Sequence, residues 1–234
     1  MSEPRIVPVE RLDLVLEPKP WGFADERRAD IDAHFAKLKA EKPALWNGRV
    51  LLMHRYAIDG GVMRGAFLET DYASFAAWQD WGRPEAGICD CFGAAAIQCA
   101  DGGYLVGVMA AHTYNAGDIY FPCGTPDPKD ITGDKVDFEF SLRRELHEET
   151  GLDGGEFEPE PGWIVAVDDE LIAAIKVMRS KLAAEVLRAR ILDHMAREKQ
   201  PELADILIVR SAADFNPDMR GFVRAFLAQR FAGR

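Results

Sequence analysis

Three glutamates near the middle of the chain have the residue type and spacing of a divalent-cation site. Glu145, Glu148 and Glu149 stand at positions i, i+3 and i+4, so a helix would place all three carboxylates on one face. Like charges at this spacing repel by roughly 0.2–0.5 kcal/mol per pair in an isolated helix. Because Mg²⁺ prefers hard oxygen ligands and would relieve that repulsion, the pattern predicts a magnesium site on this helix.

The neighbouring residues predict the helix that carries these glutamates, over about residues 137–150. Leu142 and Leu146 lie four positions apart and give the helix an apolar row that can face a core. Gly151 is the residue type that commonly ends a helix in the left-handed conformation, and Leu152 can fold back as an apolar contact. The alternative interpretation is a solvated Glu/Arg helix face, which is the usual meaning of a charge run.

The run over residues 144–152 resembles the second half of the Nudix box, Arg-Glu-apolar-x-Glu-Glu-x-Gly-apolar, at every specified position. Nudix proteins are mostly Mg²⁺-dependent pyrophosphohydrolases that cleave nucleoside diphosphates linked to another group. The resemblance implies that Glu148 and Glu149 bind the metal, Mg²⁺ or in its place Mn²⁺, and that the carbonyl of Gly124 completes the site. It leaves Glu145 as either a further ligand or the general base.

The first half of the box is less regular. An acid, Asp130, stands six residues after the box glycine, as in the family pattern, but Arg144 follows it by fourteen residues instead of eight. The segment between them therefore reads as a loop that is longer by about six residues. Counting back eight from Arg144 reaches Val136, with Asp137 and Glu139 nearby, so the first acidic position stays open. We expect Arg144 to orient the glutamates through charge-assisted hydrogen bonds.

Further site residues are expected outside the box. Many Nudix enzymes take another acid from a distant downstream loop, and Glu202, just before a predicted strand at 206–209, occupies such a place. A base there must reach the attacking water within hydrogen-bond range. His112 and Asn115 lie in a polar loop between two predicted strands and are candidates for contacting a sugar or base, although His112 also fits a structural role. Competing downstream acids are Glu198, Asp168, Asp169 and Glu170.

The remaining pattern predicts an α/β chain with a mixed sheet covered by helices. Apolar runs flank Asp-Gly-Gly turns at 59–61 and 101–103, which indicates two hairpins. Residues 1–20, interrupted by prolines, are expected to form an extended arm. Helices are expected over 25–41, 70–78, 181–198 and 218–231, and further strands over 119–123, 163–167, 171–178 and 206–209. This order agrees with the α/β/α sandwich that the Nudix resemblance implies.

A linker-like stretch at 83–87 divides the chain into an N-terminal α/β extension, residues 1–87, and a Nudix hydrolase domain, residues 88–234. Within the extension, the segments 46–48 (Trp-Asn-Gly) and 70–72 (Thr-Asp-Tyr) resemble the N-terminal part of UDP-glucose-type Nudix pyrophosphatases, which favours a nucleotide sugar as substrate. The aromatic residues Tyr72, Phe75 and Trp78 fit a helix face packed in a core, a homodimer interface or a surface that stacks a nucleobase.

Composition and charge argue against several classes of protein. A net charge of −11 disfavours a nucleic-acid-binding surface, which needs clustered Lys and Arg. No apolar run approaches about 18 residues, so no transmembrane helix is expected, and the first residues lack a secretory signal. The four cysteines lack the spacing of a zinc site and are expected to be free thiols in a reducing compartment. Together these features predict a cytoplasmic protein with a small-molecule nucleotide substrate.

These observations predict an enzyme, a Mg²⁺-dependent pyrophosphohydrolase that acts on a nucleoside diphosphate linked to a sugar or similar group. A second hypothesis is a catalytically silent Nudix-like module that senses a nucleotide or binds a protein. The complete set of box glutamates argues against it, because a sensor needs no acid that activates water. A third hypothesis is a housekeeping hydrolase of nucleoside triphosphates or of capped RNA, and the net charge argues against RNA.

Overall fold

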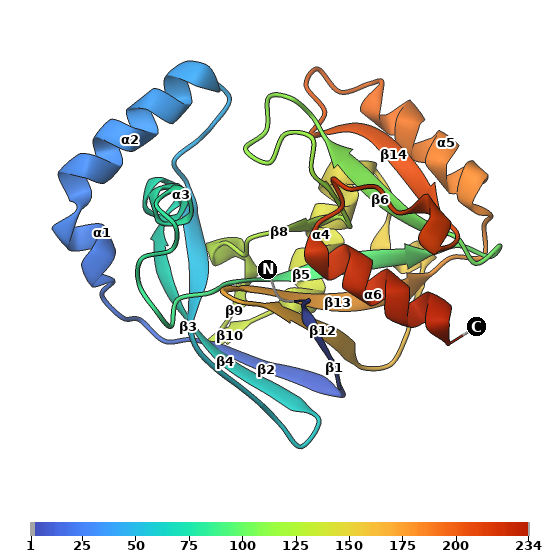
Figure 1. Ribbon diagram of the computed structural model, residues 1–234, viewed down its shortest axis with the longest axis horizontal. Coiled ribbons are helices and arrows are strands. Elements are labelled where there is room, and N and C mark those ends of the chain that lie inside the picture. Colours follow the sequence, from blue (N-terminus) through green and yellow to red (C-terminus); the bar gives the residue numbers. More distant parts are fainter. Residues whose placement is uncertain (1–2, 234) are drawn as a thin grey trace.

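A computed structural model describes residues 3–233, which form two β-sheets and the helices around them (Figure 1). The larger sheet contains β1 (Arg5–Val9), β5 (Asp90–Gln98), β6 (Tyr104–Met109), β7 (Ile119–Tyr120), β8 (Cys123–Gly124), β11 (Glu158–Pro159), β12 (Trp163–Asp168), β13 (Leu171–Arg179) and β14 (Leu203–Val209). The smaller sheet contains β2 (Arg11–Leu16), β3 (Arg49–Asp59), β4 (Val62–Asp71), β9 (Ile131–Thr132) and β10 (Lys135–Val136). The helices are α1 (Gly22–Glu26), α2 (Arg28–Glu41), α3 (Tyr72–Asp80), α4 (Phe138–Thr150), α5 (Ala184–Met195) and α6 (Gly221–Ala232), with short 3₁₀ turns η1 (Pro128–Asp130), η2 (Gly154–Glu156) and η3 (Ala212–Asp214).

The centre of the larger sheet is a parallel pair of strands, β5 and β13, in the order β1-β12-β13-β5-β6-β14. Every residue of β5 except Gln98 is buried. A strand covered on both faces reads as a continuous apolar run rather than as an alternating one, and β5 and β13 have that composition. The sheet is mixed, since the other pairings along this order are antiparallel.

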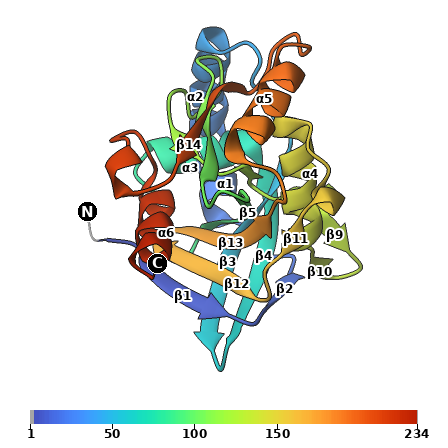
Figure 2. The ribbon, with the colours of Figure 1, turned by 90° about the vertical axis from the view of Figure 1, so that its right-hand side faces the viewer.

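Helices cover both faces of the larger sheet. Phe92 of β5 packs edge-on against Phe222 of α6, with ring centroids 5.7 Å apart. A Cβ added to the next residue, Gly93, would lie 3.1 Å from the carbonyl oxygen of Phe138 in α4. Because successive strand residues face opposite sides, α6 covers one face and α4, with α5 beside it, covers the other (Figure 2). The predicted α/β/α sandwich is confirmed.

The sheet splits near one end, and the split positions the site. β5 and β6 pair only at Gln98 and Tyr104, next to their connecting turn. Further along, β6 pairs with β7 and β5 pairs with β8. The segment 119–124 therefore separates the two strands and brings Gly124 against α4. The predicted hairpin forms at its turn but opens beyond it.

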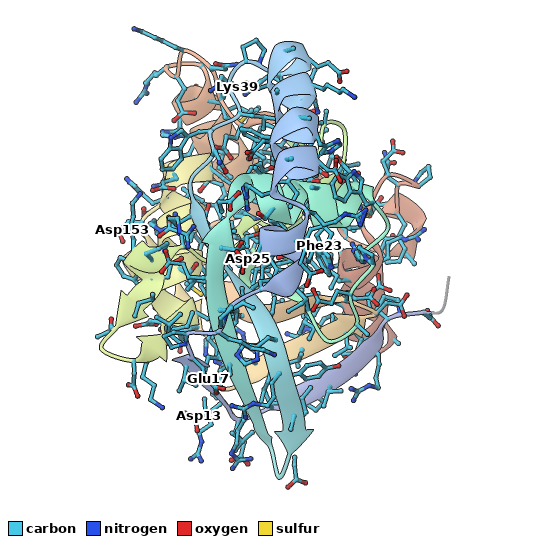
Figure 3. The ribbon with its side chains drawn as sticks, turned by 90° about the vertical axis from the view of Figure 1, so that its left-hand side faces the viewer. Asp13, Glu17, Phe23, Asp25, Lys39 and Asp153 are labelled. Atoms are coloured by element: carbon cyan, nitrogen blue, oxygen red, sulfur yellow. The ribbon has the colours of Figure 1, made fainter. Side chains whose placement is uncertain are left out.

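The smaller sheet and the first three helices form a second layer, which Figure 3 shows with α2 in front of α3 and Phe23 labelled on α1. The predicted β3–β4 hairpin is confirmed. Asp71 caps α3 by accepting a hydrogen bond from the backbone N–H of Ser74. Phe75 and Trp78 are 3% and 0% exposed and belong to an aromatic core of this layer. Their side chains are thus used inside the chain and do not offer a surface to a second copy.

The first twenty residues differ from the predicted arm. β1 pairs with β12 at the border of the larger sheet, and β2 pairs with β4 in the smaller one. Pro8 is tolerated because an edge strand can leave one backbone position unpaired. β9 and β10, from the middle of the chain, join the smaller sheet, so strand pairing crosses residue 87 in both directions. The division into units at residue 87 stays a prediction.

Candidate active site

The glutamate-bearing helix forms as its sequence predicts. The side chain of Asp137 accepts a hydrogen bond from the backbone N–H of Phe140 and caps the start of α4, and Gly151 ends the helix with φ of 67°. Leu142 and Leu146 are fully buried on its inner side. Glu149 is buried beside this row, and Glu145 lies at the edge of the same face, so both carboxylates face the split in the sheet rather than solvent.

Asp130, the acid that stands six residues after Gly124, lies beside Arg144 in the structure. It is fully buried and accepts hydrogen bonds from Arg144 Nη2 at 2.9 Å and from Ser141 Oγ at 3.0 Å. The segment that reads as a lengthened loop is folded as η1, β9 and β10, with β10 paired to β2. The extra residues therefore complete the smaller sheet, while Asp130 keeps its place beside the arginine.

Arg144 connects Asp130 to the glutamates. Its Nη1 lies 2.7 Å from Glu145 Oε1 and 3.1 Å from Glu148 Oε2. Burial of the guanidinium lowers its pKa, but the hydrogen bonds to Asp130 and the charges of Glu145, Asp130 and Glu148 outweigh this effect. The pKa of Arg144 is therefore raised far above its usual range. This is the geometry that an orienting arginine requires.

Glu149 is the most deeply buried of the three box glutamates, with 5% exposure. Its Oε1 accepts a hydrogen bond from the backbone N–H of Cys123 at 3.3 Å, and its buried Oε2 has no partner among the described residues. Burial raises the pKa of Glu149 well above its usual range, and the charges of Glu145 and Glu202 add to this. Burial likewise raises the pKa of Glu145 to about 7.

Gly124 permits a close approach of the Glu145 carboxylate to β8. A Cβ at this position would lie 2.5 Å from Oε1 of Glu145, inside the van der Waals distance. The glycine of the first half of the box therefore lies directly against the first glutamate of the second half. This contact places the backbone of β8 beside the carboxylates of α4.

A cavity of about 450 Å³ lies beside these carboxylates, within the range of roughly 300–1,000 Å³ typical of small-molecule sites. It brings together most of the residues that the sequence singled out: Gly124, Glu145, Glu149, Glu202, His112 and Asn115. Glu148 lies outside it, in a neighbouring hollow lined also by Glu145, Glu198 and Glu202. The competing acids at 168–170 line neither of the two.

Glu202 belongs to both hollows. Its side chain is exposed at their shared border, yet the surrounding protein raises its pKa by desolvation, and the charge of Glu148 adds to this. The backbone of Glu202 is fixed, because its carbonyl accepts a hydrogen bond from the N–H of Ala110 at 2.8 Å. A downstream acid therefore stands across the cavity from α4.

The donor set suits a hard divalent cation by its chemistry, since carboxylates and a backbone carbonyl are the ligands that Mg²⁺ prefers. A cation would give the unpartnered Oε2 of Glu149 a ligand. It would also compensate the negative charge whose burial raises the pKa of Glu145. Within residues 3–233, no three acidic, histidine or cysteine side chains already converge at metal-ligating distances. Glu145, turned towards Arg144, would have to rotate to complete a site.

Sequence reasoning missed several residues of the cavity, among them Asp90, Thr125 and Arg220. Asp90 is 8% exposed and burial raises its pKa to about 6. The sequence did contain a signal for Asp90, because it is a single acid at the start of an otherwise apolar strand. A charge buried in such a strand is costly and therefore indicates a functional role. Arg220 comes from the residue before α6, and no local pattern points to it.

In the part of the chain that the structure describes, no helix combines the length and hydropathy needed to cross a membrane. The four cysteines are free thiols, as predicted. The cellular compartment stays a prediction.

No protein-family model and no curated protein matches the chain. Among solved structures, it is similar to a Nudix hydrolase from M. smegmatis, RenU, at 13% identity and a TM-score of 0.37, covering 61% of this chain and 83% of that one. It is also similar to a variant of the Bacillus subtilis pyrophosphohydrolase BsRppH, at 13% identity and a TM-score of 0.35, covering 60% of this chain and 81% of that one. The Nudix resemblance rests on the box residues and on the geometry of Asp130, Arg144 and the glutamates.

Proposed function

We propose that the protein is a Mg²⁺-dependent hydrolase that cleaves the phosphoanhydride bond of a nucleoside diphosphate linked to another group. The observation that carries this proposal is Glu149, a buried carboxylate with an unpartnered oxygen in the wall of a cavity that Glu145 and Glu202 also line. A buried carboxylate is stable only when it is paired, protonated or bound to a metal. Its place beside a ligand-sized cavity favours the metal.

Glu145, Glu148 and Glu149, with the carbonyl of Gly124, are the groups that would hold the cation, and Mn²⁺ would substitute for Mg²⁺. When bound, the cation supplies neutralisation of charge on the phosphate oxygens and lowers the pKa of a bound water. Arg144 keeps the carboxylates oriented through its ion pairs. Glu148, outside the cavity, would approach the cation from the neighbouring hollow.

The reaction needs a water molecule aimed at phosphorus and a group that takes its proton. Attack of the water oxygen forms a new P–O bond, breaks the bridging P–O bond and releases two phosphate products. Glu202 is the better placed base, because Glu145 already forms an ion pair with Arg144, whereas the cationic group that acts on Glu202 is the more weakly basic His112. Its raised pKa makes it a stronger proton acceptor than an ordinary glutamate.

The group linked to the nucleoside diphosphate is proposed to be a sugar, so that the substrate is a nucleotide sugar. The polar loop that carries His112 and Asn115 lines the cavity and offers hydrogen-bonding groups for hydroxyls. Arg220, in the same cavity, supplies a local cation for phosphate in a chain whose net charge is −11. Hydrogen-bonding groups beside apolar walls are the usual composition of such sites.

The test is a panel of UDP-sugars, other nucleotide sugars, ADP-ribose, dinucleoside polyphosphates and nucleoside triphosphates, incubated with the pure protein and Mg²⁺. The expected result is release of phosphate-containing products that a chelator abolishes and that Glu149→Gln lowers by about tenfold or more. Glu158→Gln, a change at an exposed glutamate of β11, serves as the matched control and should leave turnover unchanged.

Other outcomes would replace the proposal. Metal-dependent nucleotide binding without turnover of any panel member would favour a sensor module. Turnover confined to nucleoside triphosphates would favour a housekeeping hydrolase.

A further inference from the structure

The cavity contains a second buried carboxyl group that the proposed hydrolysis does not use. Asp90 is 8% exposed and lines the same cavity as Glu149. Its Oδ1 accepts a hydrogen bond from Thr125 Oγ1 at 3.2 Å, and no donor of residues 3–233 bonds its Oδ2. Unlike Oε2 of Glu149, this oxygen is not fully buried, so it can accept a hydrogen bond from a ligand that enters the cavity.

Aromatic side chains from two layers line the same cavity as this carboxyl group. Tyr72 and Phe75 of α3 lie on one side, with ring centroids 6.0 Å apart. Phe92 of β5 and Phe222 of α6 line the same cavity from the larger sheet. Flat apolar walls with one polar group between them suit a planar ligand that carries an N–H, which is the description of a nucleobase.

The polar loop across the cavity is fixed to the N-terminal helices. Lys42, at the end of α2, donates hydrogen bonds to the carbonyls of Thr113 and Tyr114. The hydroxyl of Tyr114 donates to Asp80 at the end of α3. The cavity is therefore closed on this side by a tied loop, so its shape is set before a ligand arrives.

One short segment connects Asp90 to the carboxylates of α4. Cys123 donates its backbone N–H to Glu149, and Thr125, two residues later, donates its hydroxyl to Asp90. Two residues of extended chain span roughly 7 Å. A planar group at Asp90 and a phosphate near Glu149 would then be neighbours in one ligand, as a base and a phosphate are in a nucleotide.

We propose that Asp90 reads the nucleobase of the substrate, its Oδ2 accepting an N–H of a base held against Tyr72 and Phe75. The inference rests on the proposed function, because the phosphates at α4 fix which end of the ligand enters this part of the cavity. Asp90 is in this view a specificity residue, not a catalytic one. The sugar would lie on the other side of the phosphates.

The first test uses the unmodified protein and needs no mutation. Binding of uridine, cytidine, guanosine and adenosine monophosphates is measured by calorimetry with excess Mg²⁺, beside ribose 5-phosphate, which has no base, and glucose 1-phosphate. The tightest nucleotide is then compared with its analogue methylated on the base nitrogens that carry hydrogen. We expect the analogue to bind at least about tenfold more weakly, the effect of losing a hydrogen bond to a charged acceptor.

The second test is Asp90→Asn, which keeps the size of the side chain and removes its charge. It should weaken binding of the preferred nucleotide by about tenfold and shrink the effect of methylation, while ribose 5-phosphate binds as before. Asp101→Asn is the matched control, because Asp101 lies in the β5–β6 turn, bonded to Gly103 and Arg210, outside the cavity. Should Asp90→Asn not fold, the methylation comparison on the unmodified protein decides alone.

Equal binding of methylated and unmethylated nucleotides would overturn the proposal, as would binding of ribose 5-phosphate as tight as that of the nucleotides. Tight binding of glucose 1-phosphate with no preference among bases would also overturn it, since the sugar would then take the place beside Asp90. These measurements need no turnover. Base-dependent binding without hydrolysis would support the role of Asp90, while the proposed hydrolase function would fail. Hydrolysis at the same rate for every base would support the proposed function, while the role of Asp90 would fail.

Discussion

Asp130 and Arg144 form a largely buried ion pair with three hydrogen bonds across a separation of fourteen residues. Arg144 Nη2 lies 2.9 Å from Oδ2 and 3.1 Å from Oδ1, and Nε lies 3.2 Å from Oδ1. The other edge of the guanidinium faces Glu145 and Glu148. Asp130 therefore fixes the arginine that orients the glutamates, although its own carboxylate accepts hydrogen bonds from Asp127, Ser141 and Arg144.

Asp130→Asn should lower the free energy of unfolding by about 3 kcal/mol. The change removes the charge that compensates a largely buried guanidinium, and breaking a buried pair by losing one partner typically costs roughly 3–5 kcal/mol. The amide still accepts a hydrogen bond from Ser141, which places the effect at the low end. Urea unfolding followed by tryptophan fluorescence measures it. Asp134→Asn, at an exposed position of the β9–β10 turn, is the control, and an equal loss in both variants would contradict the assignment.

The box glutamates should make the metal-free protein less stable as the pH rises. Burial raises the pKa of Glu145 to about 7 and the pKa of Glu149 well above its usual range. The folded state then holds protons that the unfolded state has lost above its ordinary pKa of 4.5. By linkage, this contribution is most favourable below that pKa and is lost as the pH rises towards the folded values.

The same shift predicts the behaviour of Glu149→Gln in a chelating buffer. The variant should unfold at a higher urea concentration than the unmodified protein near pH 7.5, because the buried charge is gone, and the difference should shrink near about pH 5. Added Mg²⁺ should stabilise the unmodified protein more than the variant. A variant that is less stable at both pH values would show that Glu149 forms a stabilising contact other than the metal.

The core of the site could be predicted from sequence because it lies within one helix. The spacing of the glutamates, the leucine row and the glycine stop are all local signals, and α4 has the predicted limits within one residue at its start. Helix periodicity and caps depend on neighbours three and four positions away. The position of Arg144 beside Glu145 and Glu148 follows from the same spacing.

Residues that depend on long-range pairing could not be assigned in this way. Asp130 was ambiguous because the segment after it forms β9 and β10, whose partner β2 lies more than a hundred residues earlier. Asp90 could be recognised as an acid in an apolar strand but not as part of a site, because the cavity beside it exists only where β8 separates β5 from β6. No local pattern encodes such a split, since it is set by which strands pair.

Gly124→Ala should impair catalysis far more than stability. The new Cβ would lie 2.5 Å from the Glu145 carboxylate, which is the end of a flexible side chain and can move away. We expect a loss of unfolding free energy under about 1 kcal/mol and a loss of turnover of about tenfold or more, because a displaced carboxylate no longer holds its place beside β8. Gly22→Ala is the control, since its Cβ would meet nothing nearer than 3.6 Å. Unchanged turnover in Gly124→Ala would show that this contact is not needed.

Glu202→Gln should identify the general base. If Glu202 takes the proton of the attacking water, the variant loses about 10²–10⁴-fold in kcat and also loses the acidic limb of the pH–rate profile. That limb should lie above the ordinary range of a glutamate, since burial raises the pKa of Glu202. Glu198→Gln, in the neighbouring hollow and paired with His194, should change neither. An acidic limb that persists in Glu202→Gln and disappears in Glu145→Gln would transfer the role of base to Glu145.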